Sequence, residues 1–224
     1  STRILSPDHP HTLTSRNSLA GAYQASGRLD EAIPLYEQTL EDSNRIFGPS
    51  APMTLVSHIY LASAYQNAGR LNEAITLHEQ NLEDLTRILG PNHPGTLQAR
   101  NNLASAYQDA GRLDEAITLY QQTLIDRTRI LGRNHHSTRV SRKILAYTFQ
   151  KAGKLGEAIA LYEEIFEEYE ASLGPNHFQT RTLREQLASL YRDFGLFEEA
   201  KKLFEEPSDS GDAVQDDPDQ EAGD

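Results

Sequence analysis

The feature that most constrains the fold is a repeat of 42 residues that runs through almost all of the 224-residue chain. Residues 12–53 and 96–137 are identical at 25 of 42 positions. A glycine returns in each period, at Gly27, Gly69, Gly111, Gly153 and Gly195. A single unit of this length cannot bury its own apolar face, so successive units must stack. We therefore expect repeats at 12–53, 54–95, 96–137, 138–179 and 180–206, the last with a short second helix.

The pattern within each repeat predicts two helices. In the third repeat, Leu103, Tyr107 and Ala110 share one face of a helix over about 95–109. Gly111 then ends that helix, because glycine tolerates the left-handed conformation of a helix stop. A second apolar-faced helix follows from Leu113 to Leu131. The sequence therefore predicts an all-α, right-handed superhelical solenoid of about five antiparallel helix hairpins.

The two ends of the chain differ from the repeats between them. Residues 1–11 match the end of a preceding repeat, because "RILSPDHP" aligns with "RILGPNHP" at 87–94, so we expect the array to continue upstream. The last twenty residues contain nine Asp or Glu and no Lys or Arg. Removing these nine charges from the net charge of −12 leaves −3, so the body is close to neutral. Residues 207–224 are expected to form a flexible acidic tail.

Several residues of the third repeat resemble a known family. The pattern of the tetratricopeptide repeat is matched by Leu103, Ala104, Tyr107, Gly111, Leu113, Ala116 and Tyr120. The 42-residue unit is similar to the kinesin-light-chain variant of that repeat, and to bacterial arrays attached to nucleotide-binding signalling ATPases. This resemblance implies a module that binds a protein or peptide in the concave groove of the superhelix, within a larger signalling or scaffold protein.

Composition argues against several other classes of function. The chain has no cysteine, so it has no disulfide framework and no thiolate zinc site. No apolar run approaches the ~20 residues of a membrane helix, so we expect no membrane partner and a cytoplasmic location. The overall acidity, without aromatic residues interleaved among basic ones, argues against a nucleic-acid partner.

Two recurring polar residues have a structural interpretation. A histidine recurs in the connector at His9, His93, His135 and His177, and a glutamate starts each second helix at Glu31, Glu73, Glu115, Glu157 and Glu199. We interpret the histidine as a cap or packing element rather than a metal ligand. The glutamate suits the dipole of a helix start better than acid catalysis, which needs a partner group. Without any nucleophile or phosphate-loop motif, we predict no enzyme, no cofactor and no metal.

A row of amides is the candidate binding surface. Four polar residues on the first helix of the third repeat fall within about 80° of one another, opposite the apolar face. These residues and their equivalents in other repeats are Asn17, Gln24, Gln66, Gln98, Asn101, Ser105, Gln108 and Gln150. Amides both donate and accept hydrogen bonds, so we expect the row to bind the backbone of an extended peptide. The alternative, a solvated helix face, would more often carry Lys and Glu.

The same face becomes basic in the later repeats, which adds candidate residues Arg139, Lys143, Tyr147, Arg181 and Arg192. This basic half suits an acidic or carboxylate-bearing partner. It departs from the chaperone-binding carboxylate clamp, in which a lysine is followed four residues on by an asparagine, because Lys143 is followed by Tyr147. An acidic peptide, rather than a chaperone tail, is the expected partner.

Two alternatives accompany this interpretation. The acidic tail could occupy the basic half of the groove, its own or that of a neighbour. A structural role is also open, in which exposed apolar ends, including Ile4 and Leu5, drive self-association of a larger signalling protein into homo-oligomers.

Overall fold

The structure is a computed structural model that describes residues 9–205. The predictions for Ile4, Leu5 and the acidic tail at 207–224 lie outside the described residues. Within the described range the chain consists of ten helices and contains no strand. They are α1 (Pro10–Ala25), α2 (Leu29–Phe47), α3 (Pro52–Asn67), α4 (Leu71–Leu89), α5 (Pro94–Asp109), α6 (Leu113–Leu131), α7 (His136–Lys151), α8 (Leu155–Leu173), α9 (Phe178–Phe194) and α10 (Phe197–Lys202). The predicted all-α array of hairpins is confirmed.

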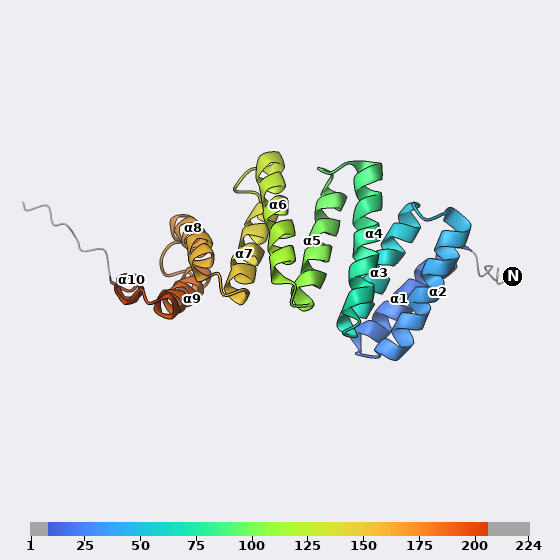
Figure 1. The fold of residues 1–224 in the computed structure, drawn as a ribbon, viewed down its shortest axis with the longest axis horizontal. Helices are drawn as coiled ribbons and strands as arrows, with labels where there is room; N and C mark the ends of the chain where they lie inside the picture. The colour runs from blue at the N-terminus through green and yellow to red at the C-terminus, as the bar shows by residue number, and fades with distance from the viewer. Residues whose placement is uncertain (1–8, 206–224) are drawn as a thin grey trace, which may run out of the picture. The chain divides into compact units, whose positions relative to one another are not determined.

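The chain divides into two compact parts between Glu168 and Tyr169, inside α8. In the first part, α1–α2, α3–α4 and α5–α6 form hairpins, and each second helix packs against the first helix of the next hairpin. Figure 1 shows these hairpins side by side. In the second part, α9 packs against the short α10.

Helix ends form where the sequence predicts them. Four first helices begin at a histidine whose Nδ1 accepts the backbone N–H two residues on, at 3.1 to 3.3 Å. This confirms the capping interpretation of the connector histidines. At the end of α5, Gly111 has φ +74° and donates to the Gln108 carbonyl, and Arg112 donates to the Tyr107 carbonyl at 2.9 Å. Both bonds belong to the Schellman motif, which requires the left-handed glycine.

Apolar side chains fill the junctions between hairpins. Tyr36 of α2 packs with Leu61 and Tyr65 of α3, and Ala20 and Ala74 complete this cluster. All five side chains have relative exposures of 9% or less. Because each junction buries the face that one hairpin cannot cover alone, stability comes from stacking.

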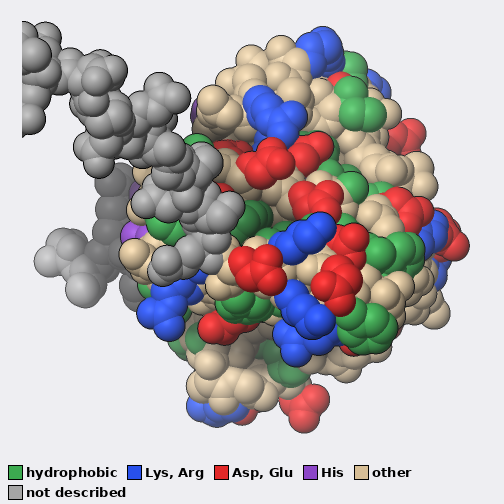
Figure 2. All heavy atoms as spheres, turned by 90° about the vertical axis from the view of Figure 1, so that its left-hand side faces the viewer, with side chains coloured by type: hydrophobic (Ala, Val, Ile, Leu, Met, Phe, Trp, Pro, Cys, Tyr) green, Lys and Arg blue, Asp and Glu red, His purple; other side chains and the backbone are tan. Residues whose placement is uncertain are grey.

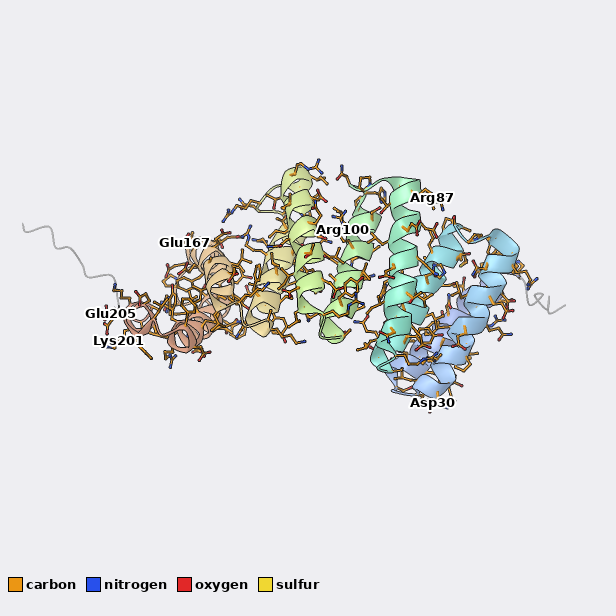
Figure 3. All side chains as sticks on the ribbon, in the orientation of Figure 1. Asp30, Arg87, Arg100, Glu167, Lys201 and Glu205 are labelled. Carbon is orange, nitrogen blue, oxygen red and sulfur yellow. The ribbon has the colours of Figure 1, made fainter. Side chains whose placement is uncertain are left out.

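Ion pairs join the two helices of a hairpin on one side. Arg16 contacts Asp42 at 2.7 Å, and Arg100 of α5, labelled in Figure 3, contacts Asp126 of α6 at 2.7 Å. At the turn, Arg112 lies over the Tyr107 ring at 4.3 Å and pairs with Glu115. Glu115 therefore holds the arginine of the turn as well as suiting the start of α6.

The first helices are covered on more than their apolar face. In α5, Ala99, Asn101 and Ala104 are buried as well as Leu103. The reason is that α5 contacts both α4 and α6, the second helices of two hairpins. Asn101, which belongs to the predicted polar face, is therefore only 9% exposed.

Candidate protein-binding groove

Two cavities of the first part meet on α5. The smaller has a volume of about 210 Å³ and is lined by Ile59, Ser63, Gln66, His78, Asn102 and Ser105. The larger, of about 360 Å³, is lined on its α5 and α6 sides by Gln98, Asn101, Asn102, Ser105, Tyr120 and Arg127. Its α7 side consists of His136, Ser137, Val140 and Ile144. Because Asn102 and Ser105 line both cavities, we call them together the amide groove.

The recurring glutamines connect neighbouring first helices. Gln24 donates from Nε2 to Ser63 Oγ at 3.1 Å, and Gln66 donates from Nε2 to Ser105 Oγ at 3.3 Å and to Asp109. Gln108 instead accepts at Oε1 from Thr148 Oγ1 at 2.8 Å. One end of each amide is thus used in holding the next hairpin. In Gln24 and Gln66 it is Nε2 that makes these bonds, and Oε1 can accept a hydrogen bond from a ligand.

Asn101 and Arg127 form a buried pair in the larger cavity. With its side-chain oxygen turned toward the guanidinium, Asn101 accepts from Arg127 Nη1 at 2.8 Å and Nη2 at 2.9 Å. Arg127 Nη1 also donates to Ser141 Oγ at 2.7 Å and to the Ser137 carbonyl at 3.4 Å. Arg127 is only 7% exposed, and burial lowers the pKa of its guanidinium.

His78 and Tyr120, which lie on second helices, also line the groove. His78 is 3% exposed, its Nδ1 has no hydrogen-bond partner, and burial lowers its pKa to about 4. Tyr120 occupies the equivalent position one repeat later. Burial raises the pKa of Tyr120 to about 12, against the opposing effect of its hydrogen bond with Ser105. Both groups are therefore neutral at pH 7.

The predicted basic half is partly neutralised by acidic residues of α8. Arg139 contacts Glu168 at 3.3 Å, and Arg142 contacts the same carboxylate at 2.8 Å. Figure 2 shows basic and acidic side chains interspersed on the face it presents. Lys143 and Tyr147 are exposed on α7, and Gln150 is half-buried near its end.

The remaining predicted residues are not among those that line the amide groove. In the second part Arg181 is exposed, and Arg192 donates from Nε to the Ala188 carbonyl at 3.0 Å. Arg192 also lines a cavity of about 440 Å³ with Phe197 and Phe204. Asn17 belongs to α1, where its side-chain oxygen is buried without a partner. Of the thirteen predicted residues, the structure therefore brings Gln66, Gln98, Asn101 and Ser105 together in the amide groove.

Arg127, His78 and Tyr120 are groove residues that were not predicted from the sequence. All three lie on second helices, whereas the predicted binding face lies on first helices. The sequence does mark two of them as departures from the repeat. The position of Arg127 is occupied by Ser43 and Leu85 in the two preceding repeats, and His78 replaces the tyrosine found at Tyr36 and Tyr120. A residue that departs from its repeat is not required by the stacking that all repeats share.

A family model for the tetratricopeptide repeat matches this chain over residues 1–45, 12–66, 53–125, 99–167 and 141–206. The chain belongs to the tetratricopeptide repeat family. Proteins of this family are in general protein-interaction scaffolds. None of the curated proteins matches the sequence.

Solved structures give the same assignment. A predicted kinesin light chain from Podosopora anserina, with nearly identical TPR-like repeats, is 32% identical with a TM-score of 0.77, over 87% of this chain and 92% of that one. BtubC (BKLC) from P. vanneervenii is 17% identical with a TM-score of 0.69, over 86% and 76%. MamA is 19% identical with a TM-score of 0.56, over 88% and 90%. The last two likenesses show the fold alone. Among the described residues, no helix is long and apolar enough to cross a membrane.

Proposed function

We propose that this tetratricopeptide repeat array is a binding module that holds an extended protein segment in the amide groove. The observation that carries the proposal is that the two cavities lie next to each other along α3, α5 and α7 and share Asn102 and Ser105 in their linings. The groove is lined by amides and hydroxyls next to apolar Ile59, Val140 and Ile144. Amides can pair with a peptide backbone, and apolar side chains can receive the segment's side chains.

Binding, rather than catalysis, suits the chemistry of this groove. His78 is neutral because its pKa is about 4, and Tyr120 is neutral because its pKa is about 12. Neither group therefore exchanges a proton readily near pH 7, where a general acid or base works best. We place the module in the cytoplasm of a bacterial cell, on the absence of cysteine and the similarity of the repeats to bacterial arrays.

Selection of linear peptides from a random library with free C-termini tests the groove directly. We expect wild-type protein to enrich a peptide family that Asn102→Arg fails to bind, because an arginine there fills the wall shared by both cavities. Ile125→Arg is the matched control, since Ile125 is 59% exposed on α6 and lines neither cavity. Equal binding of the selected peptides to both variants would place the segment elsewhere on the protein.

Self-association is a second candidate function, supported by one apolar face in each part. Leu19 of α1 is 48% exposed, whereas its equivalents Leu61, Leu103 and Leu145 are at most 5% exposed. In the second part Phe204, at the position of the buried tyrosine of other repeats, is 56% exposed. Stacking of the Phe204 face of one copy on the Leu19 face of another would repeat the contact made between hairpins within the chain.

Light scattering across a concentration series tests the second candidate. We expect the mass to rise with concentration for wild-type protein and to stay monomeric for Leu19→Glu, which places a charge in the contact. Val56→Glu, on an equally exposed residue of α3, serves as the control. A wild-type protein that stays monomeric throughout would remove self-association from consideration.

A further inference from the structure

The guanidinium of Arg127 is a buried charge that no carboxylate within residues 9–205 balances. Its contacts in the described part of the chain are to the Asn101 side-chain oxygen, Ser141 Oγ and the Ser137 carbonyl, which are all neutral. The neighbouring carboxylate of Asp126 is paired with Arg100 and Arg129 instead. Taking an arginine out of water without an opposing charge costs several kcal/mol, so this arrangement is unusual for a purely structural residue.

The surroundings hold the guanidinium toward the cavity without neutralising it. Asn101 accepts from Nη1 and Nη2 and Ser141 accepts from Nη1, so these bonds do not use Nε. No Asp or Glu lines the 360 Å³ cavity among the residues that the structure describes. Gln98 and Asn102, which line the same cavity, add amide groups that donate hydrogen bonds.

The other repeats show that stacking does not require this arginine. At the third junction, between the third and fourth repeats, the three residues are Asn101, Arg127 and Ser141. Each has an equivalent 42 residues earlier at the preceding junction. We call these positions the junction triad. At the second junction the triad is Ile59, Leu85 and Ala99, which is wholly apolar, and at the first it is Asn17, Ser43 and Ser57. Equivalent helices of the other repeats therefore stack with uncharged residues at the positions of this arginine and its two acceptors.

We propose that the Arg127 cavity binds one carboxylate group of the protein segment held in the amide groove. A carboxylate matches the single positive charge and can accept two N–H groups of a guanidinium. A phosphate carries close to two negative charges at pH 7, which one arginine among neutral amides does not balance. This inference rests on the proposed function in one respect: the carboxylate is taken to belong to a protein segment.

Small carboxylates test the site without knowledge of the partner. The probes are N-acetylglutamate amide for a side-chain carboxylate, N-acetylglycine for a chain terminus, neutral N-acetylglutamine amide and inorganic phosphate. Binding is followed by NMR at the Arg127 Nε–H and Asn101 side-chain amide signals. Because a guanidinium bonds more strongly to a charged acceptor than to a neutral one, we expect a carboxylate to bind at least about tenfold more tightly than the neutral amide. The tighter of the two carboxylates identifies the source.

Two variants separate the site from general charge effects. Arg127→Leu copies Leu85 of the second junction and should reduce carboxylate binding to the level of the neutral amide. Arg127→Gln, which keeps a hydrogen-bonding side chain, gives the same test if the leucine variant does not fold. Arg129→Leu removes an exposed arginine of α6 that lines no part of the cavity, and should leave binding unchanged.

Three results would overturn the proposal: equal binding of N-acetylglutamate amide and its neutral analogue, retained carboxylate binding in Arg127→Leu and Arg127→Gln, or tighter binding of phosphate than of either carboxylate. Failure of the peptide selection with carboxylate binding intact would instead reject the extended protein segment and keep the anion site.

Discussion

The second and third junctions of the array pack equivalent helices of successive repeats with different side chains. At the second, the junction triad is Ile59, Leu85 and Ala99, and at the third a guanidinium is held by an amide and a hydroxyl. Both junctions keep the same backbone contact, because the threonine at the start of the next helix, Thr96 or Thr138, bonds to the carbonyl of the triad's second member. The stacking of repeats therefore constrains the backbone and leaves the triad free to vary.

The largest expected effect comes from moving the arginine alone into the second junction. Leu85→Arg places a guanidinium beside Ile59 and Ala99, which offer no side-chain acceptor. Leu85 is half-buried, so we expect a loss of about 3–4 kcal/mol in the free energy of unfolding, because the partly buried charge would lack both partner and hydrogen bonds. Urea unfolding followed by circular dichroism measures it. A loss below about 1 kcal/mol would show that Asn101 and Ser141 are not needed to bury the charge.

The two junctions also differ in acid sensitivity, because His78 stands where the later repeat has Tyr120. The folded-state pKa of His78 is about 4, below its unfolded value of 6.5, so the unfolded chain binds the proton first as pH falls. The contribution of neutral His78 to the free energy of unfolding is therefore fully present above pH 6.5. This free energy falls by about 3 kcal/mol as the pH drops to 4. His78→Tyr should remove this part of the loss.

Unfolding midpoints at pH 7 and pH 4 measure the effect of His78→Tyr. The burial of His58 also lowers its pKa, so part of the acid dependence should survive in the variant. An unchanged difference between the two pH values would show that His78 does not titrate as its burial requires.

Replacing the junction triad of the third junction by the apolar residues of the second should increase the free energy of unfolding. The triple variant Asn101→Ile, Arg127→Leu, Ser141→Ala replaces a buried charge and its acceptors by apolar groups. We expect a gain of about 2 kcal/mol in the free energy of unfolding, because such replacements often stabilise proteins by about 1–4 kcal/mol. The same urea experiment measures it, with Arg127→Leu alone as the comparison. A clear loss of stability in the triple variant would mean that the arginine is structural.

The smallest effect is expected from building a second site at the first junction. Asn17 and Ser57 already stand at the positions of Asn101 and Ser141, and the Asn17 oxygen is buried without a partner. Ser43, which lies 3.5 Å from Ser57 Oγ to Oγ, takes the place of Arg127. Ser43→Arg should therefore add a carboxylate site that binds about tenfold above the neutral amide, or about 1.4 kcal/mol.

NMR titration of Ser43→Arg with N-acetylglutamate amide follows this added site at the Asn17 side-chain amide signal. If the variant folds and only the Arg127 site responds, the triad alone is not sufficient for binding.

The fold could be predicted because its signals recur. In every repeat a glycine equivalent to Gly111 adopts a positive φ, and an apolar residue at the position of Leu113 begins the next helix, so the hairpins follow from the period. The groove could be predicted only in part. A helical wheel gives the direction of Asn101 and Gln108 but not which neighbour covers them, and α5 is covered by two second helices. Arg127 could not be predicted as a groove residue, because the cavity that it lines forms only when α5, α6 and α7 pack together.

The most direct test of the account is an NMR map of the protein with a library-selected peptide bound. Chemical-shift changes should concentrate on Ser63, Gln66, Asn102, Ser105 and Val140, which line the amide groove, with the Arg127 Nε–H signal among the largest. They should disappear when the acidic group of the peptide is replaced by its amide, in both the wild-type protein and the Arg129→Leu control. Changes confined to the exposed faces of α4 and α6, with Arg127 unmoved, would contradict it.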